Sequence, residues 1–68
     1  MNIHNKNIKA GNILADGNSR FYVLEVDRGR DGSTIVRGVY HAPARNEEPT
    51  ATQIFRLDEK ADLVGNYV

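Results

Sequence analysis

Arginines and tyrosines in the middle of the chain are the side chains best suited to binding chemistry. A guanidinium group binds phosphate through paired hydrogen bonds, and an aromatic ring on a strand can stack on a nucleotide base. Acidic residues of the same segment, Glu25, Asp27 and Asp31, dilute the positive charge, and the tyrosines suit the rim of a core equally well. The candidate binding surface comprises Arg20, Tyr22, Arg28, Arg30, Arg37, Tyr40 and Arg45.

Residues 28–32 combine two arginines with two glycines, so they can contact a phosphate through guanidinium groups and exposed amides. The phosphate-binding loop of nucleotide-binding enzymes carries a Lys-Ser/Thr pair and precedes a helix, and both are missing from this stretch. Glycine also forms tight turns, because it adopts positive φ without steric cost. We expect these glycines to form a turn.

The histidines and paired carboxylates follow no pattern typical of a metal or catalytic site. His4 lies in a polar segment and His41 begins a proline-containing loop. With no cysteine and no regular spacing of His, Asp and Glu, the sequence predicts no metal and no other cofactor. Adjacent carboxylates such as Glu47 and Glu48 point apart in an extended chain and so lack the geometry of an acid/base pair. We therefore expect no enzymatic activity.

Composition indicates a single small domain with balanced charge. The chain has 68 residues, with nine basic and nine acidic side chains and no cysteine. A chain of this length buries about 60% of the surface that its unfolded form exposes, and no disulfide or thiolate–metal site reinforces it. The balanced charge argues against a protein that seeks nucleic acid by charge alone.

Charge is divided unevenly along the chain. Residues 1–46 carry seven basic and four acidic side chains, whereas residues 47–68 carry two basic and five acidic ones. Lobes of opposite sign can steer a partner or favour contact between two copies of the chain. Scatter over a solvated surface gives the same division, so both interpretations stay open.

The N-terminal segment is polar, and no apolar run approaches the roughly 20 residues that span a bilayer. We therefore expect a cytoplasmic protein with no membrane partner. Residues 1–68 are predicted to form one domain, in which residues 1–7 are a flexible tail.

The candidate surface comes mainly from a predicted β-hairpin over residues 20–40. Two runs, residues 21–26 and 33–40, are rich in β-branched and aromatic side chains and flank a polar turn with two glycines. No apolar stripe repeats at helical spacing. Apolar residues occupy both faces of each run, which is typical of bent strands that serve two packed layers, and Gly38 indicates a bulge or sharp bend.

Further strands are predicted on both sides of this hairpin. Residues 8–15 form a strand that a tight turn at residues 16–19 separates from the hairpin, and residues 50–57 regain β character. Residues 41–50 form a long loop, because Pro43 and Pro49 remove donors from any ladder. Residues 58–62 suit at most a single helical turn, and residues 63–68 suit a short last strand.

Five short strands with tight turns, one long loop and a polar turn before the last strand resemble an SH3-like small barrel. The resemblance covers residues 8–67, and Lys9-Ala10-Gly11-Asn12-Ile13 resembles the glycine-containing opening strand of KOW- and Tudor-like barrels. It concerns an architecture and singles out no family within it. Such barrels mostly act as binding modules rather than enzymes, although a shared fold does not fix a function.

The apolar residues set the functional expectation. Phe21, Val23, Val36 and Ile54 are predicted to lie outside the core, where they would mark an interface. We expect a non-enzymatic adaptor or regulator that binds a protein partner, with a homodimer as one form of this; the alternative is a nucleic-acid-binding barrel. The predicted core comprises Tyr22, Leu24, Val26, Ile35, Val39, Phe55 and Leu57.

Overall fold

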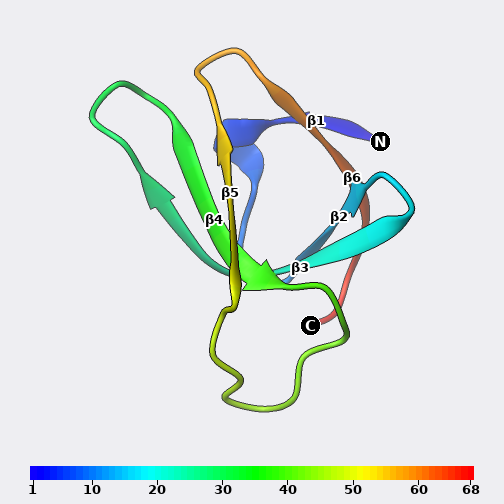
Figure 1. Cartoon of the computed structure of the whole chain (residues 1–68). Coiled ribbons are helices and arrows are strands. Elements are labelled where there is room, and N and C mark those ends of the chain that lie inside the picture. The colour runs from blue at the N-terminus through cyan, green and yellow to red at the C-terminus, as the bar shows by residue number, and fades with distance from the viewer.

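Six antiparallel strands form one strongly bent sheet in the computed structural model, which describes all 68 residues (Figure 1). The strand order is β1-β6-β2-β3-β4-β5, so β1 and β5 are the two edges. None of its helical segments is long and apolar enough to cross a membrane. The elements are β1 (Asn2–His4), the 3-10 turn η1 (Asn5–Asn7), β2 (Asn12–Asp16), β3 (Ser19–Arg28), β4 (Thr34–Val39), β5 (Ala51–Phe55) and β6 (Lys60–Asn66).

The predicted hairpin is confirmed as β3 and β4, which pair from Tyr22 and Val39 to Arg28 and Thr34. The register shifts between Val23 and Glu25, which leaves Leu24 as an extra residue. Gly38 lies opposite Val23 at this bulge, and a Cβ there would collide with the carbonyl oxygen of Tyr22. Glycine at position 38 therefore permits the close approach of two backbones that bends the sheet.

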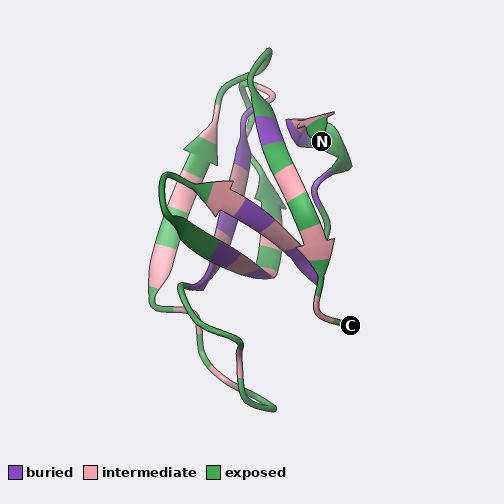
Figure 2. Ribbon diagram, turned by 90° about the vertical axis from the view of Figure 1, so that its right-hand side faces the viewer, coloured by how far each residue is buried: buried purple, intermediate pink, exposed green.

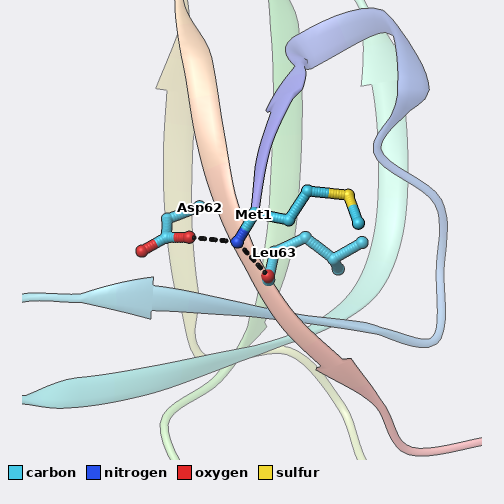
Figure 3. Close-up of polar contacts among 3 residues, drawn as sticks. All are labelled: Met1, Asp62 and Leu63. Carbon is cyan, nitrogen blue, oxygen red and sulfur yellow. Dashed lines mark hydrogen bonds and ion pairs between the residues drawn. The ribbon is translucent and has the colours of Figure 1, made fainter.

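The N-terminal residues differ from the flexible tail that the sequence predicts. β1 pairs with β6, with Ile3 opposite Ala61, and η1 follows at once. The ammonium group of Met1 lies 3.0 Å from both the Asp62 Oδ1 atom and the Leu63 carbonyl oxygen, as Figure 3 shows. With β1 the sheet has six strands where five were expected.

The predicted helical turn at residues 58–62 is wrong. A tight turn at Leu57 and Asp58 leads directly into β6, which begins at Lys60 and takes in most of the expected last strand. The single 3-10 turn lies at Asn5–Asn7 instead, where the imidazole of His4 accepts a hydrogen bond from the backbone N–H of Lys6. The long loop is present between β4 and β5, and it extends away from the sheet in Figure 1.

The core lies on the concave side of the sheet and differs from the predicted one. Of the residues predicted for it, Val26 and Phe55 pack against the cluster while half-buried, but Tyr22, Leu24 and Ile35 are half-exposed on the other face. The bulge explains the error in β3, because the extra residue at position 24 reverses the alternation between Val23 and Val26. In β4 a buried neighbour of Ile35 is Val36, so Ile35 lies on the opposite face. The buried cluster comprises Ile8, Leu14, Phe21, Val23, Val36 and Ala61.

Two other predicted core residues have different positions. Val39 is fully buried, but it lies outside the main cluster and opposite Tyr22 in the ladder. Leu57 is 48% exposed in the turn before β6, beside Gly32. The sheet therefore buries apolar side chains on both faces at its centre and leaves them exposed near β5.

A buried asparagine closes one end of the core. The side-chain amide of Asn5 donates to the carbonyl oxygens of Arg56, Leu57 and Glu59, and its oxygen accepts from the hydroxyl of Thr34 at 2.7 Å. Asn5 is fully buried, and its one side chain provides a hydrogen-bond partner for the three carbonyl oxygens and for the Thr34 hydroxyl. It thereby ties η1 to the β5–β6 turn and brings the two ends of the bent sheet together.

Candidate functional site

Two arginines of the candidate surface are already bound within the fold. The guanidinium of Arg28 donates to the hydroxyl of Thr34 at 2.6 Å and to the carbonyl oxygen of Lys6 at 2.7 Å. Arg37 forms an ion pair with Asp27 at 3.2 Å, where the two side chains lie beside each other on β4 and β3. Arg28 uses both of its terminal nitrogens in these contacts and would have to give them up to bind a phosphate, while the Asp27 carboxylate offsets the charge of Arg37.

The other three arginines are exposed but lie apart. Arg20 is at the start of β3, near the turn from β2, whereas Arg30 is in the turn beyond the opposite end of that strand. Arg45 is in the loop between β4 and β5. The structure therefore does not gather the predicted arginines into one phosphate-binding surface.

The two tyrosines have structural partners. Tyr22 is half-buried and its ring meets that of Tyr67 edge-on at a centroid distance of 5.7 Å. Tyr40 meets Phe21 in the same way at 5.1 Å, and its hydroxyl donates to the carboxylate of Asp16 at 2.7 Å. That hydrogen bond raises the pKa of Tyr40, because it holds the proton on the phenol. Tyr40 remains 47% exposed, with its ring against that of the buried Phe21.

His41 and Glu47 brace the long loop. The imidazole Nε2 contacts the Glu47 carboxylate, which also accepts from the backbone N–H of Ala44 at 2.8 Å. The Ala44 hydrogen bond and His41 lower the pKa of Glu47. No three histidine, aspartate or glutamate side chains in the structure come together as a set that could hold a metal ion.

A shallow cleft of about 400 Å³ separates this loop from the outer face of β3. It has charged groups of both signs, and its apolar contribution comes partly from the last two residues of the chain. Its lining comprises Leu24, Glu25, Pro43, Ala44, Arg45, Asn46, Glu47, Tyr67 and Val68.

The β5 edge is the part of the surface where apolar exposure and free backbone coincide. β5 pairs with β4 on one side and has no neighbouring strand on the other. Ile54 is 64% exposed on this strand and lies opposite the half-buried Ile35 of β4. An edge strand presents backbone donors and acceptors to any chain that can lie alongside it.

Side-chain exposure alternates regularly along this edge. Glu48, Thr50, Thr52, Ile54 and Arg56 are exposed, and the residues between them are half-buried, as the colours along β5 show in Figure 2. No charged side chain and no proline lies between Thr50 and Phe55, so the usual protection against strand pairing is missing there.

Of the apolar residues predicted to lie outside the core, only Ile54 does so. Phe21, Val23 and Val36 are fully buried and form the centre of the core. Alternation alone places Ile54 on the outer face, but only the sheet order reveals that its strand is an edge.

No protein-family model, curated protein or solved structure matches the chain.

Proposed function

We propose that this chain is a small, non-enzymatic binding domain that engages a protein partner along the free edge of β5. The observation that carries the proposal is the exposed Ile54 on an edge strand without charges or prolines. An extended segment of a partner would add a strand there, with main-chain hydrogen bonds for affinity and side-chain contacts for selectivity. We place the domain in the cytoplasm, in keeping with a chain that uses no cysteine.

The proposed architecture is an SH3-like barrel with one additional strand. Its support is the consecutive order β6-β2-β3-β4-β5, the short turn from β5 to β6 and the tie that Asn5 makes to that turn. β1 is the addition, at the far side of β6.

Nucleic-acid binding is the weaker candidate. Arg28 and Arg37 are held by intramolecular partners, and the exposed arginines lie at separate places on the surface. A phosphate-contacting surface would need several free cations on one face, and its affinity would fall steeply with added salt.

Affinity capture with three baits, the wild type and two variants, tests the proposal. Thr52→Lys places a charge on the outer face of the edge, whereas Ser19→Lys adds the same charge at an exposed position on β3. From nuclease-treated lysate of the source organism, we expect wild type and Ser19→Lys to retain the same proteins and Thr52→Lys to lose them. Retention by all three baits would contradict the edge proposal, and loss on nuclease treatment would favour nucleic acid.

A further inference from the structure

The outer row of the β5 edge is complementary to itself. In order, it carries a glutamate, two threonines, an isoleucine and an arginine, at positions 48, 50, 52, 54 and 56. Thr52 and Ile54 lie on β5 itself, and the other three lie in the exposed residues that flank it. Glu48 and Arg56 each lie four positions from Thr52, on opposite sides of it. An antiparallel second copy aligned on Thr52 therefore places Glu48 opposite Arg56 of that copy, and does so twice.

From this pattern we infer that the partner of the β5 edge is β5 of a second copy, paired antiparallel about Thr52. This inference rests on the proposed function, since it uses the same edge. Opposed side chains in such a ladder have Cβ atoms about 4.5–5.5 Å apart, close enough for the two ion pairs to form. Thr50 then lies opposite Ile54 of the second copy, and the two copies of Thr52 face each other.

Both charged groups are available for this pairing. Neither Glu48 nor Arg56 takes part in an ion pair within the chain, and both residues are exposed. Hydrogen bonds with Ser33 are the largest cause of the lowered pKa of Asp31, and the charge of the Arg56 guanidinium acts in the same direction. Docking therefore breaks no ion pair. The backbone of Arg56 is already occupied, since its N–H donates to Glu59 Oε1 at 2.7 Å and its carbonyl oxygen accepts from Asn5 at 2.9 Å, so the main-chain pairing does not extend to Arg56 and only its side chain takes part.

Charge also selects the register. Alignment about Gln53 instead would place Arg56 opposite Thr50 of the second copy and Glu48 level with the turn at Leu57 and Asp58, so neither ion pair could form. Side chains on one face can pair only with side chains on the same face, so an alignment between Thr52 and Gln53 is excluded. Thr52 is thus favoured over its neighbour as the centre of symmetry.

One strand pair buries less than the 1,200–2,000 Å² or so of a stable interface, so the dimer is in equilibrium with monomer. Raised salt weakens its ion pairs, because both charges are exposed. The association is accordingly studied at low salt and at concentrations up to about 1 mM.

Sedimentation equilibrium on charge-reversed variants tests the inference. Glu48→Arg sets two arginines opposite each other at both ends, and Arg56→Glu sets two glutamates there, so each should dimerise about tenfold more weakly than wild type or worse. A mixture of the two variants restores both attractive pairs, as does the double variant that carries both changes. Recovery in the mixture is the result we expect, with unchanged melting temperatures as the control for folding.

Three results would overturn the inference. The first is a wild type that stays monomeric at every concentration. The second is a dimerisation constant that Thr52→Lys leaves unchanged. The third is that Glu48→Arg and Arg56→Glu dimerise equally and that mixing them brings no gain. A monomeric wild type whose capture of another protein is still lost in Thr52→Lys would refute the dimer and leave the proposed binding edge intact.

Discussion

The two edges of this sheet are built in opposite ways. β1 is three residues long, is followed at once by η1 and is anchored by the buried side chain of Asn5. β5 is five residues long, carries an exposed isoleucine and has no strand along its free edge, and the side-chain amide of its Gln53 donates to Asp16 and to the Tyr40 hydroxyl. The buried Asn5 ties the end of β1 to the β5–β6 turn, while β5 keeps the features of a binding strand.

The largest effect should come from releasing the anchor that Asn5 forms. Asn5→Ala removes the donor that serves three carbonyl groups and leaves the buried hydroxyl of Thr34 with one partner fewer. We expect a loss of about 2–4 kcal/mol in the free energy of unfolding, measured by urea denaturation. Asn7→Ala, in the same turn but exposed, is the control and should cost under about 0.5 kcal/mol. Equal losses in both variants would contradict the anchoring role of Asn5.

A smaller loss should follow removal of the guanidinium that supports this anchor. Arg28→Ala deletes hydrogen bonds to Thr34 and to the carbonyl oxygens of Asn5 and Lys6. We expect about 1–2 kcal/mol of destabilisation, because the group is only partly shielded from water. Arg30→Ala, in the adjacent turn, should be neutral in the same denaturation experiment. If the two variants behaved alike, Arg28 would be a solvated surface residue after all.

The open edge should tolerate substitution without loss of stability. Ile54 is 64% exposed, so Ile54→Thr keeps a β-branched side chain and should change the free energy of unfolding by under about 0.5 kcal/mol. The same variant should weaken association at the edge, seen by sedimentation on a concentration series. A clear fall in melting temperature would show that Ile54 belongs to the core rather than to a binding strand.

The smallest effect concerns the loop that leads into the open edge. The folded state lowers the pKa of Glu47 from its ordinary value of 4.5, so its contribution to loop order is complete above that value. The contribution is lost as the pH falls through the lowered pKa, when the carboxylate no longer accepts from Ala44. The amide resonance of Ala44 should therefore move during an acid titration of the wild type, and Glu47→Gln should abolish that transition. A titration with unchanged Ala44 shifts would contradict this bracing.

Sequence patterns predicted the central hairpin because its evidence is local. β-branched residues mark both strands, glycines mark the turn, and Gly38 marks the bend. The phase of the core could not be predicted in the same way, because one extra residue at Leu24 reverses the alternation and nothing in the side chains of β3 reveals it.

The candidate site could be predicted from the sequence less well than the fold. The sequence does not distinguish one arginine of the predicted surface from another, yet in the structure Arg28 donates a hydrogen bond to Thr34 and Arg30 has no such partner. Asn5 lies in a polar segment that reads as a tail, and its role depends on carbonyl groups about fifty positions away. Likewise, the sequence predicts that Ile54 lies outside the core, but that its strand is an edge of the sheet follows only from the strand order.

A concentration series of ¹H–¹⁵N correlation spectra at low salt most directly tests whether β5 is the edge that binds. Every backbone amide is followed from dilute solution to about 1 mM. We predict that the shifts change for Glu48 to Arg56 and for the neighbouring residues of β4, while the amides of β1 stay fixed. Changes confined to β1 or to the cleft beside residues 43–47, or no change at any concentration, would contradict the pairing of two β5 edges.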